Sequence, residues 1–184
     1  MFKAKIAVLG PVKSGKTSIC NILSNAVERY GGDYRPTKGV RILEFESSYL
    51  QVNEKNINCE IELWDCSGDQ KYKPFWPVFL HKTVGCILVY DPTSATDAKE
   101  LDLFYDCIVD TPTNELQSCV VFANNKEKNK RVEKKLSSKF DELEHVIVDI
   151  EDDIKGVKSS FDAFLVDLLK KLWDMQYERD DLIH

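Results

Sequence analysis

The chain has 184 residues, of which 43% are hydrophobic and 30% are charged, and its formal net charge at pH 7 is −6. This length suits one domain, which is large enough to bury a core without disulfides or a structural metal. The acidic balance excludes the dominant basic surface with which proteins bind nucleic acids or anionic membranes, so we expect neither of these as a partner.

Short apolar runs alternate with longer periodic segments along the chain, which is typical of an α/β fold with a mostly parallel sheet. The first run predicts a strand at 5–9, followed by a glycine-containing turn and a helix at 16–29. A loop at 30–39 leads to two further strands, at 40–50 and 56–64. The polar segment between these strands is typical of a hairpin turn, so the two strands are predicted to be antiparallel.

The second half of the chain continues the alternation of strands and helices. A loop that includes Trp76 and Pro77 is followed by strands at 84–90, 119–123 and 146–148, with a helix at 97–109. A C-terminal helix carries an apolar stripe with helical spacing, which we expect to face the core; its members are Phe161, Phe164, Leu165, Leu168, Leu169 and Leu172. No linker or repeat divides the chain, so we expect a single domain over residues 1–184.

Cysteine placement and the absence of targeting signals indicate the expected compartment. The six cysteines form no CxxC pair, and several lie in apolar runs, as expected for reduced core thiols of a cytoplasmic protein. The sequence has no signal peptide, no apolar stretch of about 18 residues and no myristoylation or prenylation motif. We therefore expect a cytoplasmic protein with no lipidated tail and no direct membrane anchor.

The strongest local signal is a complete G-x-x-x-x-G-K-[ST] motif at residues 10–17. Its glycines let consecutive main-chain N–H groups point at a phosphate, and the start of the following helix adds positive potential. The lysine then reaches the β- and γ-phosphates, and the final hydroxyl ligates Mg²⁺. The predicted nucleotide-binding residues here are Gly10, Pro11, Val12, Lys13, Ser14, Gly15, Lys16, Thr17 and Ser18.

Three residues outside this motif complete a predicted metal and γ-phosphate site. Asp65 ends a predicted strand and supplies a carboxylate for the metal, while Gly68 lets a main-chain N–H approach the terminal phosphate. Thr37, in the loop before the second strand, offers a second hydroxyl. A simple turn with a capping hydroxyl would also explain Thr37. The predicted metal ligands are Thr17, Thr37 and Asp65.

The order and spacing of these motifs resemble the small GTPases of the Ras superfamily, and among them the Rab-like proteins. The resemblance covers the whole chain. It implies a three-layer P-loop NTPase fold, in which a six-stranded, mostly parallel sheet with one antiparallel strand has helices on both faces. It also implies GTP/GDP and Mg²⁺ as cofactors.

Residues 39–46 and 64–69 are similar to the Rab-like GTPase subunits of the intraflagellar transport B complex. That resemblance implies a place in the cilium or flagellum and at its base. It also implies coiled-coil subunits of that complex as protein partners, contacted through the switch regions.

Two departures from the family pattern predict slow GTP hydrolysis. The family has a water-orienting glutamine directly after the glycine of D-x-x-G, whereas this chain has Asp69 there and Gln70 one position later. Val12 replaces a small residue beside the γ-phosphate. Asp69 and Gln70 are thus the candidate catalytic residues, and we expect a rate below the roughly 10⁻⁴ to 10⁻³ per second of Ras alone.

Base recognition also departs from the family motif N-K-x-D. One register assigns the motif to Asn124, Asn125, Lys126 and Glu127, and the other begins at Asn125 and places Lys128 in the carboxylate position. We prefer the first register because it keeps an acceptor for guanine. Losing one charged hydrogen-bond partner costs about 1.5–3 kcal/mol, which is roughly 10- to 150-fold in affinity.

Aromatic residues cluster after the D-x-x-G segment, at Tyr72, Phe75, Trp76 and Phe79. In Rab-like proteins such residues, with the position held here by Ile42, form the partner-binding surface, although packing onto the sheet would also explain them. We expect one or two to be exposed.

Together these features predict a nucleotide-dependent switch or adaptor subunit. The alternatives are a structural subunit that holds its nucleotide permanently and a small P-loop kinase. The five scattered arginines disfavour the kinase.

Overall fold

The computed structural model describes residues 2–26, 35–111, 115–125 and 136–181, with side chains up to residue 176. In this part of the chain six strands form one sheet in the order β2-β3-β1-β4-β5-β6. The strands are β1 (Phe2–Leu9), β2 (Val40–Val52), β3 (Lys55–Cys66), β4 (Gly85–Tyr90), β5 (Ser118–Asn124) and β6 (Glu144–Val148). Neighbouring strands are parallel except for β2 and β3, which are antiparallel.

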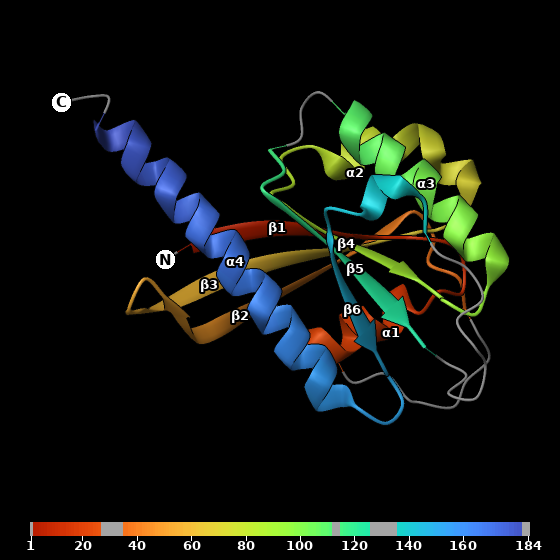
Figure 1. Cartoon of the computed structure of the whole chain (residues 1–184), viewed down its shortest axis with the longest axis horizontal. Helices are drawn as coiled ribbons and strands as arrows, with labels where there is room; N and C mark the ends of the chain where they lie inside the picture. Colours follow the sequence, from red (N-terminus) through yellow and green to blue (C-terminus); the bar gives the residue numbers. More distant parts are fainter. Residues whose placement is uncertain (1, 27–34, 112–114, 126–135, 182–184) are drawn as a thin grey trace.

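Helices cover both faces of the sheet (Figure 1). The α-helices are α1 (Lys16–Leu23), α2 (Trp76–Leu80), α3 (Ala95–Asp110) and α4 (Ile154–Asp181), and two 3₁₀ helices are η1 (Gln70–Phe75) and η2 (Ser138–Phe140). One core cluster joins α1 and α4 to the sheet, and a second joins α2 and α3 to its other face. The predicted three-layer α/β fold is confirmed.

Strand β1 shows how the pattern specifies the layers. Ala4, Ile6 and Val8 contribute to the core under α1 and α4, whereas Ala7 and Leu9 contribute to the core under α2 and α3. This alternation follows from the two-residue period of a strand. The central strands bury both faces, so β4 is buried along its whole length.

The apolar stripe predicted for the C-terminal helix faces the core as expected. Phe161, Phe164, Leu165, Leu168 and Leu169 are buried, and Leu172 packs against them. The helix lies close to β4, because a Cβ at Gly85 would be 2.9 Å from Leu168 and 3.0 Å from Phe164. Figure 1 shows α4 crossing the sheet and extending beyond it on the side where the β2–β3 hairpin lies.

The hairpin between β2 and β3 is tighter than predicted. Asn53 and Glu54 both have positive φ angles, of 48° and 63°, so two residues make the turn and the strands extend to Val52 and Lys55. This geometry matches a turn whose twist suits the strands. The pairing register then shifts between Ser47 and Leu50, which is a β-bulge.

Two sequence predictions were wrong about helices. The segment at Trp76 and Pro77 is helical, because proline is compatible with a first helical turn and Trp76 packs on Phe104 with ring centroids 4.4 Å apart. The helix predicted at 16–29 ends at Leu23: the Ser24 hydroxyl donates to Cys20 O, and Asn25 has a φ of 52°. Residues 27–29 lie outside the described ranges.

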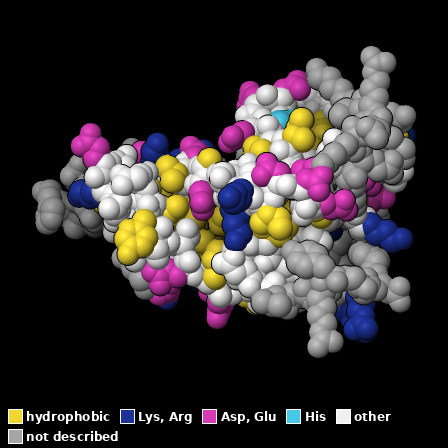
Figure 2. Space-filling model, turned by 90° about the horizontal axis from the view of Figure 1, so that it is seen from below, with side chains coloured by type: hydrophobic (Ala, Val, Ile, Leu, Met, Phe, Trp, Pro, Cys, Tyr) yellow, Lys and Arg dark blue, Asp and Glu magenta, His cyan; other side chains and the backbone are white. Residues whose placement is uncertain are grey.

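The surface is mixed in character, and the cysteines form no disulfide. Acidic, basic and hydrophobic side chains are interspersed over the face shown in Figure 2. All six cysteines are free, and Cys20, Cys59, Cys66 and Cys86 are buried. In the described part of the chain, no helix has both the length and the apolar character that a membrane span requires.

Candidate phosphate and metal site

The loop between β1 and α1 needs its glycines for steric reasons. Gly10 has a φ of 147°, and a Cβ there would lie 1.9 Å from Val89 O. Gly15 has a φ of 102°, and a Cβ there would lie 2.2 Å from Asn124 Nδ2. Both positions therefore require glycine. With glycine there, the backbone can adopt the conformation of the predicted phosphate cradle.

Lys16 is buried beneath this loop. Its Nζ donates to Pro11 O at 2.6 Å and lies 3.5 Å from Ser14 Oγ. Burial lowers the pKa of the Lys16 ammonium to about 8, and the nearby Asp65 carboxylate opposes that shift. A phosphate in the loop would give this buried cation an anionic partner, so the residues present fit a polyphosphate.

The three predicted metal ligands converge beside Lys16. The Thr17 hydroxyl donates to Asp65 Oδ2 at 2.9 Å, Thr37 Oγ1 lies 2.9 Å from Thr17 Oγ1, and the Thr37 hydroxyl donates to Asp65 Oδ2 at 3.4 Å. Asp65 is fully buried, and its Oδ1 has no hydrogen-bond partner among the described residues. Two hydroxyls and a carboxylate form an oxygen donor set that suits Mg²⁺.

The electrostatics of Asp65 are set by burial and its neighbours. Burial raises the pKa of the Asp65 carboxyl, while the hydrogen bond from Thr17 and the charge of Arg41 oppose that shift. Within the described ranges, no three His, Cys, Asp or Glu side chains converge as a metal site. Mg²⁺ prefers six oxygen ligands, so a cation at Asp65 would complete its coordination with water or with oxygen atoms of a bound nucleotide.

Sequence reasoning missed Arg41, which it counted only as one of five scattered arginines. Its Nη2 lies 3.4 Å from Asp65 Oδ2 and donates to Asn21 Oδ1, on α1, at 2.6 Å. The register pairs Arg41 with Asp65 across β2 and β3. Counting back from the turn would place Ile42 opposite Asp65, and the bulge near Ser47 moves the pairing by one residue.

The segment after β3 packs directly on the phosphate loop. A Cβ at Gly68 would lie 2.5 Å from Gly10 O and 2.6 Å from Val12 N, so only glycine fits there. The neighbouring Ser67 N donates to Gly39 O at 2.8 Å. The loop that carries Thr37 and the loop that carries Gly68 are thus joined through their main chains.

The two candidate catalytic residues lie outside the hydrogen-bonded cluster around Asp65. The Asp69 carboxylate accepts a hydrogen bond from Lys71 N at 3.0 Å and forms an ion pair with Lys71 Nζ at 2.7 Å, which lowers the pKa of Asp69. Gln70 is exposed at the start of η1. Val12 is 44% exposed, at the mouth of the loop.

The base end of the site is less complete than the phosphate end. Asn124 Nδ2 donates to Ser14 O at 2.8 Å, and Asn125 N donates to Val148 O at 3.1 Å. The side-chain oxygens of both asparagines are buried without hydrogen-bond partners among the described residues. Lys126 and Glu127 lie outside the described residues. The bond from Asn124 to the phosphate loop favours the register that begins at Asn124.

The predicted aromatic cluster divides between core and surface. Trp76 is buried, Tyr72 and Phe79 are partly buried, and Phe75 is 54% exposed. Two aliphatic side chains are also exposed, Ile42 of β2 at 46% and Val78 of α2 at 64%. Val78 was missed because it lies in the segment predicted to be a loop.

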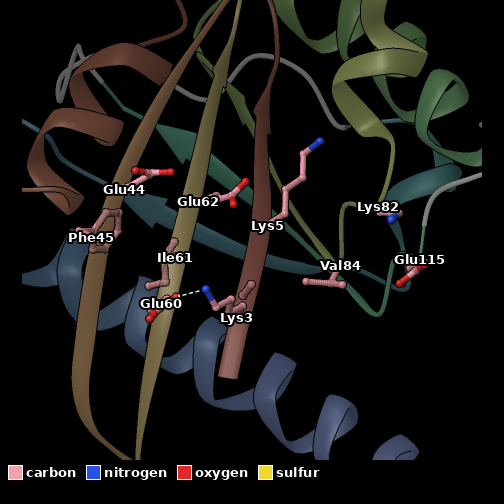
Figure 3. A pocket seen from close by; sticks show the side chains of 11 residues that line it. Lys3, Lys5, Glu44, Phe45, Glu60, Ile61, Glu62, Lys82, Val84 and Glu115 are labelled. Atoms are coloured by element: carbon pink, nitrogen blue, oxygen red, sulfur yellow. Dashed lines mark ion pairs between the residues drawn. The ribbon is translucent and has the colours of Figure 1, made fainter. Parts of the chain in front are cut away.

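A hollow of about 680 Å³ lies elsewhere, at the opposite end of β1 from the phosphate loop (Figure 3). Its walls carry mainly charged side chains of β1, β2 and β3, among them Lys3, Lys5, Glu44, Glu60 and Glu62. Lys3 pairs with Glu60 at 2.5 Å across the hollow. The volume of a cavity therefore does not locate the phosphate site in this fold. The hydrogen-bond donors of the loop locate it.

Comparison with known proteins agrees with the geometry. The family model described as "Ras of Complex, Roc, domain of DAPkinase" matches residues 5–128. The chain is 33% identical over 184 residues to the intraflagellar transport protein 22 homolog of Danio rerio, covering 99% of this chain and 98% of that protein. It is 33% identical over 174 residues to the human homolog, covering 94% and 93%. It is also 33% identical over 202 residues to intraflagellar transport associated protein 2 of Caenorhabditis elegans, covering 91% and 79%.

Proposed function

The chain belongs to the Ras-like small GTPase family and, within it, groups with the intraflagellar transport protein 22 homologues; from this premise we propose that it is a GTP-binding switch or adaptor subunit of the intraflagellar transport B complex. It acts in the cilium or flagellum and at its base, and its partners are coiled-coil subunits of that complex.

One observation carries the nucleotide assignment: Thr17, Thr37 and Asp65 meet within 2.9–3.4 Å of one another, beside the buried Lys16. Thr37 comes from a loop far from Thr17 in sequence. A triphosphate with its metal gives all of these groups a common partner, which supports GTP binding over a simple glycine turn. The cofactors are GTP or GDP and Mg²⁺.

The switch follows from residues at the mouth of the loop. Thr17, Thr37 and Asp65 would hold Mg²⁺, and the bound cation would neutralise negative charge on the phosphates. Gly68 packs on the loop backbone, so its N–H would lie close to a terminal phosphate held by that loop. The main-chain bond from Ser67 to Gly39 makes the two switch loops respond together.

The partner surface is formed by the exposed Ile42, Phe75 and Val78. Ile42 follows the loop that carries Thr37, and Phe75 follows the loop that carries Gly68, so both respond to nucleotide. Large apolar side chains that stay exposed on a folded protein are candidate anchors for a partner helix.

Hydrolysis is slower than in Ras. Asp69 is held by Lys71, so its carboxylate is not free to orient a water molecule. Its negative charge disfavours a transition state rich in anionic oxygens, and the β-branched side chain of Val12 crowds the space beside the γ-phosphate where the attacking water must be positioned.

The nucleotide assignment is tested by denaturing the purified protein and identifying the released nucleotide by chromatography. GTP supports binding with slow turnover, and GDP shows that hydrolysis occurs. ATP would overturn the base assignment, and the absence of any nucleotide, with none bound on addition of GTP and Mg²⁺, would reject the proposed function.

A second candidate, favoured by the engagement of Asp69 with Lys71, is a structural subunit that holds GTP permanently. It is separated from the switch by comparing partner binding of the wild type and Thr17→Asn. A switch loses most of its partner affinity in the variant. A structural subunit that still folds keeps it. The kinase alternative finds no support in the family match.

A further inference from the structure

Arg41 brings a second positive charge, besides Lys16, to the carboxylate that is expected to hold the metal. Its Nη2 lies 3.4 Å from Asp65 Oδ2, the same oxygen that accepts from the Thr17 hydroxyl at 2.9 Å. A guanidinium and the magnesium ligands thus share one carboxylate oxygen.

The position of Arg41 is built by three elements of the fold. Asn21 lies one helical turn after Thr17, so α1 presents both side chains on the same face. The buried Asn21 Oδ1 accepts from Arg41 Nη2 at 2.6 Å and directs the guanidinium toward Asp65. The bulge in β2 sets the register that puts Arg41 opposite Asp65.

Because Asp65 is buried, its contact with Arg41 matters for the stability of the fold. Asp65 is fully buried, and a buried carboxylate without a cation is strongly unfavourable. The Arg41 side chain is only partly buried, at 30% exposure, so it has a path to solvent. The Arg41 guanidinium can therefore move away from Asp65 when Mg²⁺ binds there.

We propose that Arg41 is a positioning residue for magnesium exchange: it neutralises Asp65 when Mg²⁺ leaves and competes with Mg²⁺ when it binds. This inference rests on the proposed nucleotide function. Arg41 keeps the nucleotide-free protein folded, and it raises the Mg²⁺ concentration needed to retain nucleotide.

The first test measures release of a fluorescent GDP analogue from the wild type and from Arg41→Gln over a range of free Mg²⁺. Because a competing cation is removed, the midpoint for nucleotide retention in the variant shifts to about tenfold lower Mg²⁺. Arg41→Lys keeps the charge and shifts the midpoint less. The control is Arg35→Gln, which removes the same charge from an exposed position and leaves the midpoint unchanged.

An unchanged midpoint in Arg41→Gln, or one shifted to higher Mg²⁺, would overturn the proposal, because Arg41 would then be inert or would assist the metal. A purely structural role does not tighten Mg²⁺ binding. If the wild type binds no nucleotide at any Mg²⁺ concentration, the proposed function fails instead.

The second test needs no nucleotide. Thermal unfolding in a chelator is compared for the wild type, Arg41→Gln, Asp65→Asn and the double variant. Arg41→Gln lowers the melting temperature, and the loss is smaller in the Asp65→Asn background, where no carboxylate needs a cation. An equal loss in both backgrounds would show that Arg41 acts only by packing, and the proposal would be rejected. Should Arg41→Gln not fold, recovery of folding in the Arg41→Gln/Asp65→Asn double variant supports the proposal, and failure of that double variant to fold, while Asp65→Asn folds, rejects it.

Discussion

The phosphate end and the base end of the site are built from different kinds of groups. At the phosphate end the chain offers main-chain atoms, two obligatory glycines and Lys16 to the proposed ligand, and a buried hydrogen-bonded cluster forms around Asp65. At the base end the described groups are the amides of Asn124 and Asn125, and each has a buried oxygen without a partner. Main-chain recognition depends on a short motif, whereas side-chain recognition changes whenever one residue changes.

Among the described residues, a hydrogen bond joins the two ends. Asn124 Nδ2 donates to Ser14 O at 2.8 Å, beside Gly15. The comparison therefore predicts that changes at the phosphate end reduce binding of every nucleotide, while changes at the base end alter the preference among bases.

The largest effect is expected for Lys16→Ala. The variant removes the buried ammonium that we propose pairs with the phosphates, so affinity for GTP and GDP should fall by about 100-fold or more. Isothermal titration with each nucleotide measures the loss, and Lys38→Ala, at an exposed position, is the matched control. Equal affinity in Lys16→Ala and the wild type would remove the basis of the phosphate site.

Gly15→Ala should affect both ends at once. The added methyl group would overlap Asn124 Nδ2, and the φ of 102° is strained for alanine. We expect a lower melting temperature and a loss of about tenfold or more in affinity for GTP and ATP alike. The double variant Gly15→Ala/Asn124→Ala relieves the overlap but not the backbone strain, so it recovers only part of the stability.

Asn124→Ala should have a smaller effect on the phosphate end and a clear one on the base. Loss of the hydrogen bond to Ser14 O costs about 0.5–1.5 kcal/mol, or roughly 2- to 13-fold in GTP affinity. Competition between GTP and ATP measures the base preference, which should weaken. Asn125→Ala is the comparison variant, and a larger effect there would favour the register that begins at Asn125.

The smallest effect is expected on hydrolysis. Asp69→Gln removes a negative charge near the γ-phosphate and the ion pair with Lys71, so single-turnover phosphate release should rise by about two- to tenfold. Nucleotide affinity should stay within about twofold, because Asp69 lies outside the cluster around Asp65. A wild-type rate above that of Ras would contradict the assignment of Asp69 and Val12 as impairing residues.

Local patterns in the sequence predicted most of the scaffold and the phosphate end. The buried strands β1, β4 and β5 contain short apolar runs, and the glycines of the phosphate loop stand at fixed spacing. Thr37 and Asp65 were predicted as metal ligands because the chemistry of a metal site requires oxygen donors at a loop and at a strand end, and the structure brings their side chains together. These features depend on residues close together in the sequence or on one rule of fold geometry.

The features that sequence reasoning missed depend on tertiary contacts. Arg41 reaches Asp65 only because a bulge shifts the register of β2, and no residue pattern there signals the bulge. Trp76 becomes helical because it packs on Phe104 of α3. The ion pair of Asp69 with Lys71 depends on the local turn into η1.

The bond between Ser67 N and Gly39 O has a consequence for how such a protein can diverge. Since both partners are peptide groups, no side-chain replacement short of proline at position 67 deletes the bond. Mutation can therefore reshape the docking residues on either loop while the mechanical link between the loops is inherited intact. A partner that pulls one loop outward loosens the other, and the site opens from two sides at once.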